Sequence, residues 1–188
     1  MGGSIPILTL QVTLEGIDPL IWRRLEVPSD MTLARLHRVL QVAMGWTDTH
    51  LHQFLDGEDR YGPLDSEMGK QRDERGTRVG DLLQSPGDRI TYAYDFGDGW
   101  EHEILLERKS MPEPRGTYPI CVGGERACPP EDCGGVPGYL DFLEAVSQTN
   151  HPRHAEMIEW IGGEFDPEAF SVERVNRKLR SGSRNTRR

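Results

Sequence analysis

The chain has 188 residues and a formal net charge of −9, a size that fits one domain with or without an appended helical part. The charge is uneven. Arg174–Arg188 carries seven basic residues and no acidic one, which leaves 15 basic against 31 acidic residues, a net of −16, in the remainder. A body this acidic repels phosphate backbones, so nucleic acid is excluded as a partner except through the basic end, Lys178–Arg188.

The sequence also indicates a compartment. No apolar run approaches the roughly 20 residues of a membrane span, and the start MGGSIPIL lacks the charged region and apolar core of a signal peptide. Three cysteines, an odd number, argue against a secreted disulfide scaffold. We therefore expect a cytoplasmic protein without a membrane segment.

The first elements along the chain are a predicted hairpin and helix. Residues 7–14 alternate apolar and polar side chains, as a half-buried strand does. Residues 21–27 predict a second strand, with Ile21, Arg23, Leu25 and Val27 on one face, and Gly16–Pro19 supplies a turn between the two. A helix follows, with Thr32 or Asp30 as its N-cap and Gly45 at its end. Its apolar side chains recur at helical spacing: Leu33, Leu36, Val39, Leu40 and Ala43.

The middle of the chain predicts three more strands, Leu51–Leu55, Ile90–Tyr94 and Glu101–Glu107. Residues 56–76 are polar and rich in glycine, which predicts a long loop, and Thr77–Leu83 fits a short strand or one helical turn. Met111–Gly138 contains much proline and glycine and all three cysteines, so we expect it to be irregular but compact.

The last part predicts helices over Tyr139–Val146, His154–Ile161 and Pro167–Leu179. The order of elements predicts an α+β fold: a mixed or antiparallel sheet of about five strands with a packed helix, in β-grasp-like order, followed by a C-terminal helical part. We expect one domain over residues 1–179 and a disordered basic tail over 180–188. The domain comprises sheet and helix (5–110), the Cys/Pro/Gly loop region (111–138) and the helical part (139–179).

The motif Tyr94–Ile104, YDFGDGWEHEI, has two interpretations. As a hairpin loop, Asp98–Gly99 makes the turn and Asp95 accepts backbone N–H groups. Trp100, His102 and Ile104 would then share one strand face, with His102 semi-buried. As a site, Asp95, Asp98 and His102 would be metal ligands, or His102 and an acid would form a general acid–base pair.

The cysteines and the first histidines give a second candidate. Cys121, Cys128 and Cys133 are separated by six and four residues rather than by the two of a zinc knuckle, which is typical of buried cysteines in a braced loop. They would complete a zinc site only if the fold adds one histidine: His50, His52 or His102. His50 and His52 themselves would lie on one side of a strand, where two imidazoles can hold a metal. This spacing more often gives one exposed and one partly buried ring. Glu131 and Asp132 precede a predicted helix, where negative charge suits the helix dipole.

Recognised catalytic motifs are absent from the sequence. There is no Gly-x-Ser-x-Gly elbow, no Walker loop and no Gly-x-Gly-x-x-Gly before a helix.

Five segments, in order, resemble the plasmid pRi ORF-three-like family: QVTLEGIDPLIWRRLEVPSDMTLARLHRVLQVAMGW, HLHQF, YDFGDGWEHEI, ACPPEDCGG and GGEFDPEAFSVERVN. The resemblance covers Ile5–Leu179 and implies a similar α+β fold, an association with plasmids and mobile elements, and no agreed activity. Some members are labelled TnpR-type transposon resolvases. Resolvase chemistry does not fit this chain, because Ser4 has no arginine before Arg23, no tyrosine follows Tyr139, and the acidic body opposes phosphate binding.

The sequence therefore supports three hypotheses. The first is a non-enzymatic protein-interaction module acting through the loops that hold Asp95, Asp98, Trp100, His102, Glu131 and Asp132, with no cofactor and an unknown protein partner. The alternative is a metal-dependent, hydrolase-like enzyme that uses His50, His52, Asp95, Asp98, His102 or the cysteines, with zinc as the ion. The third is weak nucleic-acid binding through Lys178–Arg188.

Overall fold

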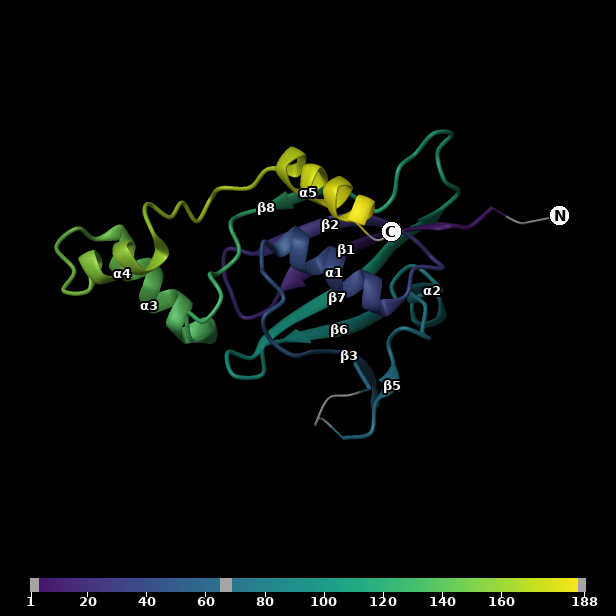
Figure 1. Cartoon of the computed structure of the whole chain (residues 1–188), viewed down its shortest axis with the longest axis horizontal. Coiled ribbons are helices and arrows are strands. Elements are labelled where there is room, and N and C mark those ends of the chain that lie inside the picture. The colour runs from purple at the N-terminus through teal and green to yellow at the C-terminus, as the bar shows by residue number, and fades with distance from the viewer. Residues whose placement is uncertain (1–3, 65–68, 186–188) are drawn as a thin grey trace.

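The computed structural model describes residues 4–64 and 69–185 and has an α+β fold with one mixed sheet (Figure 1). The strands are β1 (Ile7–Leu14), β2 (Ile21–Pro28), β3 (His52–Asp56), β4 (Asp59–Gly62), β5 (Arg72–Asp73), β6 (Arg89–Tyr94), β7 (Trp100–Ser110) and β8 (Ile120–Glu125). The helices are α1 (Leu33–Met44), α2 (Val79–Leu82), α3 (Gly135–Ser147), α4 (His154–Ile161) and α5 (Val172–Asn185).

The sheet has the strand order β5-β4-β3-β6-β7-β1-β2-β8, and every neighbouring pair is antiparallel except β4 and β5. Alternation places one face of each long strand in the core, because successive side chains point to opposite faces. One inner row runs across five strands through paired residues: Ile21, Leu14, His102, Tyr92 and Phe54. All five are buried, so the two polar members of the row lie in the centre of the core.

Helix α1 covers this inner face, and its ends are those that the sequence predicts. The Thr32 hydroxyl accepts a hydrogen bond from the Arg35 N–H at 3.3 Å, which satisfies one free donor of the first turn. Gly45 ends the helix at φ 94°, a conformation that glycine adopts without the steric cost of a side chain.

Helix α5 lies beside α1 on the same face of the sheet (Figure 1). Its Asn176 exchanges two hydrogen bonds of 2.8 Å with the backbone of Cys121 in β8, accepting from the N–H and donating to the carbonyl. The edge strand β8 is therefore paired on its open side by a side chain, which blocks pairing with another chain at that position.

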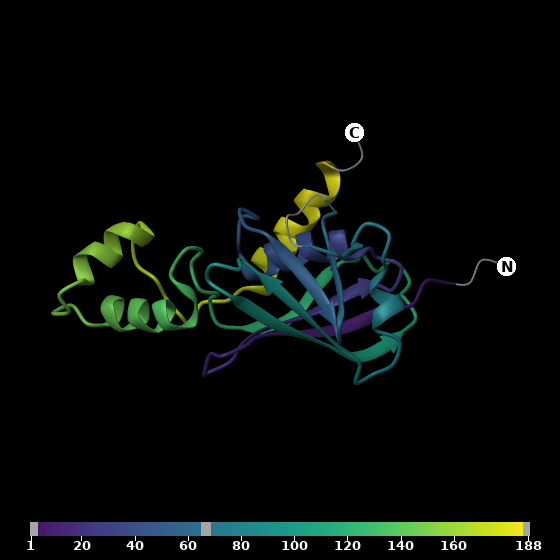
Figure 2. The ribbon, with the colours of Figure 1, turned by 90° about the horizontal axis from the view of Figure 1, so that it is seen from below.

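Helices α3 and α4 form an antiparallel arm that projects from one end of the sheet in both views (Figures 1 and 2). Tyr139 and Phe142 of α3 are buried, and Phe142 packs edge-on against Phe165 and Trp160. The arm therefore has its own small apolar interior, and the segment just before α3 joins it to the sheet.

The α+β class, the first hairpin, α1 and the three late helices are confirmed, but the sheet is larger than predicted. Eight strands form where about five are expected, because β4 and β5 lie in the predicted loop 56–76 and β8 lies in the predicted irregular segment 111–138. The β-grasp-like order is not matched in detail.

The last predicted helix begins later and ends later than expected. Helix α5 continues to Asn185, so residues 180–185 of the predicted disordered tail are helical, while 186–188 lie outside the described residues. Across the described ranges, no helix combines the length and the apolar character needed to cross a membrane.

Candidate functional site

The turn between β6 and β7 is a five-residue loop, not a two-residue Asp-Gly turn. Asp95 adopts φ 55°, and its Oδ1 accepts hydrogen bonds from the N–H groups of Gly97 (3.0 Å) and Asp98 (3.3 Å). Gly99, at φ 70°, closes the loop by donating to the Asp95 carbonyl at 2.6 Å. The hairpin interpretation of the motif is confirmed, and Asp95 has a structural role through one oxygen while the other stays available.

Trp100 and His102 face the core, as their shared strand face predicts, but they are more deeply buried than expected. Trp100 is 1 % exposed, so it cannot contribute to an exposed contact surface. His102 is fully buried, with Nδ1 3.2 Å from the Tyr92 carbonyl and the Trp46 ring edge-on at 5.2 Å. Burial lowers the pKa of His102 to about 4, so the ring is neutral near pH 7.

Three loops meet at the base of the helical arm: residues 46–51, 95–99 and 131–135. The Gly134 N–H donates to Asp98 Oδ2 at 3.1 Å, which joins the loop 131–135 to the hairpin loop 95–99. Glu131 accepts from the Tyr94 hydroxyl at 2.5 Å and from the Thr47 hydroxyl, which joins the loop 131–135 to the segment after α1. The proximity of the two candidate loops, which the interaction hypothesis assumes, is thereby established.

Gly135 makes this junction sterically possible. It adopts φ 68°, and a Cβ at this position would overlap the Asp98 carbonyl oxygen. Only glycine fits both the backbone conformation and the contact, so the sequence Cys133-Gly-Gly135 is a packing requirement of the loop junction.

His50, Asp95 and Asp132 converge at this junction, one from each loop. His50 Nε2 lies 3.1 Å from Asp132 Oδ1 and 3.6 Å from Asp95 Oδ2. Although this nitrogen is buried, neither oxygen is placed to form a directed hydrogen bond with it. Two ligand atoms that each lie about 2.1 Å from a shared ion are at most about 4.2 Å apart, and both distances from His50 Nε2 fall below this limit.

The electrostatic environment at this junction is negative. The pKa of the Cys133 thiol is raised to about 12, first by burial and then by the nearby carboxylates of Asp98, Asp132 and Asp95. Burial alone would raise the pKa of Glu131, but hydrogen bonds from Thr47 and Tyr94 outweigh it and lower that pKa. Cys133 is therefore a thiol and Glu131 a carboxylate near neutral pH, and the excess negative charge favours a cation.

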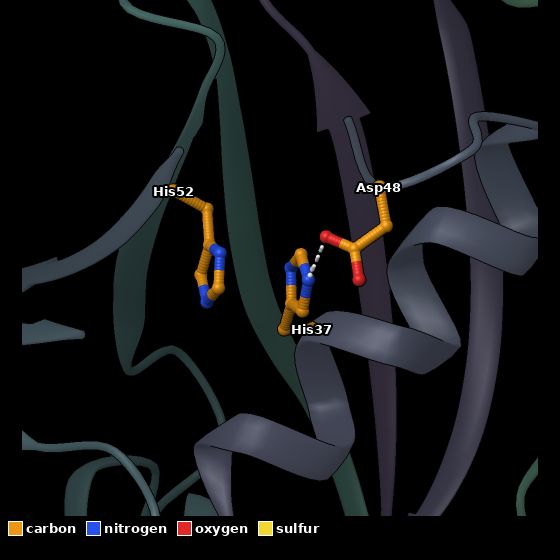
Figure 3. A group of neighbouring side chains, drawn as sticks. All are labelled: His37, Asp48 and His52. Atoms are coloured by element: carbon orange, nitrogen blue, oxygen red, sulfur yellow. Dashed lines mark hydrogen bonds and ion pairs between the residues drawn. The ribbon is translucent and has the colours of Figure 1, made fainter. Parts of the chain in front are cut away.

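A second group lies deeper, between α1 and β3. His37 and His52 stack face to face, with ring centroids 3.4 Å apart and planes 4° from parallel (Figure 3). His37 Nε2 lies 2.7 Å from Asp48 Oδ1, and His52 Nε2 lies 2.7 Å from Glu74 Oε2. Each ring therefore has its own carboxylate partner.

The stacked pair has the geometry of a hydrogen-bonded core network. His37 Nδ1 lies 2.8 Å from the Tyr92 hydroxyl, which also accepts from Gln41 at 3.0 Å. The lone pair of an imidazole nitrogen lies in the ring plane, so two parallel rings cannot aim at one ion unless a ring turns. Burial and the neighbouring His52 lower the pKa of His37 to about 4, against the opposing effect of Asp48.

The three cysteines are free thiols, and none belongs to a cluster of metal-ligating atoms in the described part of the chain. The Cys121 thiol donates to the Gly123 carbonyl at 3.3 Å, and the Cys128 sulfur lies 3.6 Å from the Met44 sulfur. Burial raises the pKa of Cys128 to about 12. The structure therefore does not assemble the three-cysteine zinc arrangement considered from the sequence.

Comparison with known proteins places the chain in a family. Residues 6–174 match the family described as plasmid pRiA4b ORF-3-like protein. The chain belongs to this family. It is 40% identical over 176 residues to the uncharacterized protein y4hQ of Sinorhizobium fredii, covering 92% of this chain and 90% of that protein. The crystal structure of MM3350, a protein of unknown function from Methanosarcina mazei Go1, superposes with a TM-score of 0.82 at 34% identity, covering 91% of this chain and 98% of that one.

The resemblance recognised in the sequence to the pRiA4b ORF-3-like family is therefore confirmed. Of the candidate residues, six lie at the loop junction: His50, Asp95, Asp98, Glu131, Asp132 and Cys133. The other five lie in the core or beside it: His52, Trp100, His102, Cys121 and Cys128. His50 and His52 do not share a site in the described part of the chain, because β3 begins at His52 and the two rings join different groups.

Sequence reasoning did not find His37 of the stacked pair or the residues that bond to the pair: Gln41, Asp48, Glu74 and Tyr92. The sequence does contain a pattern that indicates two of these five residues. His37 and Gln41 follow Leu33 by one and two helical turns, so they fall on the apolar side of α1. Polar side chains at core-facing helical positions require buried partners, and that requirement would have indicated a polar network.

Proposed function

We propose that this protein is a divalent-cation-binding interaction domain. The observation that carries the proposal is His50 Nε2, a buried nitrogen without a hydrogen bond, 3.1 and 3.6 Å from two carboxylate oxygens. An imidazole and two carboxylates suit Zn²⁺ or Mn²⁺, and three protein ligands leave room for water or a partner's side chain.

The ion would act at the base of the helical arm. Asp132 lies three residues before α3, His50 lies just before β3, and Asp95 begins the hairpin loop. An ion bound by all three therefore fixes the arm relative to the sheet. The arm exposes Leu140 at 50 % and Trp160 at 45 %, and exposed aromatic and aliphatic side chains of this kind anchor protein interfaces. The three free thiols of the protein support a cytoplasmic location for this role.

Calorimetric titration with Mn²⁺ and with Zn²⁺ tests the cation site. We expect one equivalent to bind, and Asp95→Asn and Asp132→Asn each to weaken binding by about tenfold or more, because each removes a charged ligand. An asparagine at position 95 keeps an acceptor for the loop N–H groups, so the hairpin is preserved. Asp30→Asn, an exposed residue outside the site, is the matched control.

Hydrogen exchange tests the role of the ion in the arm. Added Mn²⁺ should slow exchange in residues 131–161 of the wild type and leave the Asp132→Asn variant unchanged, because ordering of the arm depends on the bound ion. Tight binding without a change in the arm would refute the interaction role and leave the cation site intact.

One observation favours a second candidate, a metal-dependent hydrolase. A cavity of about 260 Å³ lies between α3 and α4, and Asp132 and Arg153 both line it. A substrate in this cavity would lie close to an ion at Asp132, and a bound ion lowers the pKa of its water. Turnover of p-nitrophenyl esters or phosphodiesters that requires Mn²⁺ and is lost in Asp132→Asn would favour the enzyme over the interaction domain.

A further inference from the structure

A second cavity, of about 330 Å³, lies between the end of α1 and the start of α5. Three cationic side chains line it, Arg23, Arg174 and Lys178, and no acidic residue does. Its remaining wall is mostly apolar and includes Phe170, Val42 and Met44. In a protein with a net charge of −9, a hollow with only positive charges is an unusual local feature.

Arg23 is the buried cation of this cavity, only 2 % exposed. Four of its five N–H groups donate to backbone carbonyls, those of Ala43, Trp22, Glu125 and Arg126, at 2.7 to 2.9 Å. Its guanidinium also lies over the Phe170 ring, 4.1 Å from the centroid. Within residues 4–64 and 69–185, no carboxylate lies within ion-pair distance of it, so its charge is held by dipoles and a ring alone.

Arg174 and Lys178 add two exposed cations. They are four residues apart on α5 and so lie on the same side of the helix, one turn apart. Neither has an ion pair with any residue of the described ranges. The Ser171 side chain accepts from the Arg174 N–H at 3.1 Å at the first turn of α5, where the helix dipole adds positive potential.

We propose that this cavity binds a small phosphate-bearing organic molecule. Arginine and lysine bind phosphate oxygens through charge-assisted hydrogen bonds, and the buried, unpaired charge of Arg23 would gain a counter-ion. The apolar wall would contact the organic part of the ligand, and the volume lies at the lower end of the range of small-molecule sites. None of the residues that line the cavity is His50, Asp95 or Asp132, so the proposal does not depend on the cation site.

Titration with pyrophosphate, with AMP and with a short single-stranded DNA tests the proposal. The wild type should bind pyrophosphate or AMP, and the double variant Arg174→Gln/Lys178→Gln should bind about tenfold more weakly or worse, since two charged contacts are lost. The control is Arg177→Gln/Arg180→Gln, which removes the same charge from exposed positions on the same helix outside the cavity. It should change affinity by less than about twofold. Arg23 itself is left intact, because its loss would disturb the fold.

Three results would overturn the proposal. One is the absence of binding of pyrophosphate and of AMP at millimolar concentration. Another is an equal loss in both double variants, which would show diffuse attraction to a basic helix. The last is DNA binding that is tighter than AMP binding and equally sensitive to both variants, which would make α5 a nucleic-acid contact.

Discussion

Because His37 and His102 are buried as neutral imidazoles, we predict that the free energy of unfolding decreases in mild acid. The pKa of His102 and that of His37 are each lowered from 6.5 to about 4, chiefly by burial. Below pH 6.5 the two imidazoles are therefore protonated in the unfolded chain, whereas in the folded chain they stay neutral down to about pH 4. Stability is fully present above that range and is lost as the pH falls through it. Linkage gives a loss of about 2 kcal/mol for each histidine between pH 7 and pH 5.

Urea unfolding at pH 7, 6 and 5, followed by tryptophan fluorescence, measures this loss. Trp46 contacts His102 directly, so the signal reports on the same part of the core. His102→Gln keeps a donor for the Tyr92 carbonyl but cannot titrate. Its own loss between pH 7 and pH 5 should be smaller than that of the wild type by about 2 kcal/mol. Equal losses in the two proteins, or a wild type equally stable at both pH values, would refute the reasoning.

Three further substitutions test the packing around the sites by urea unfolding. Gly135→Ala should destabilise more than Gly162→Ala: both glycines have positive φ, but only at position 135 does a Cβ overlap a neighbour, Asp98. Equal costs would contradict the close contact. Asn176→Ala should cost about 2 kcal/mol and loosen α5, because it leaves two buried backbone groups of β8 unpaired. Arg23→Lys should cost about 3 kcal/mol, since an ammonium cannot reach the same carbonyls, and a cost below about 1 kcal/mol would contradict its role.

The elements that the sequence predicted are those with a local signal. The alternation of residues 7–14, the shared face of residues 21–27, the apolar stripe of α1 and the Gly45 terminator each determine structure over a few residues. Strands β4, β5 and β8 escaped prediction because they are short or glycine-rich and are stabilised by neighbours distant in sequence. Gly123 and Gly124 in β8, for example, pair with Arg24 and Arg23, and no local sequence pattern indicates that pairing.

The candidate site was predictable in its loops and not in its geometry. The residue types of the motif pointed to Asp95, and those before α3 pointed to Asp132, but only the fold brings them to His50. His102 has the same chemistry as His50 and was an equal candidate. His102 differs because it lies on the strand face that points into the core. The sequence predicted this face but not how deeply the ring is buried.

The most direct test of the cation site is an anomalous difference map from crystals grown with Mn²⁺. The structure predicts one strong peak within about 2.2 Å of His50 Nε2, Asp95 Oδ2 and Asp132 Oδ1. A peak between His37, Asp48 and His52 instead, or no peak in density that shows all three ligands in place, would contradict it.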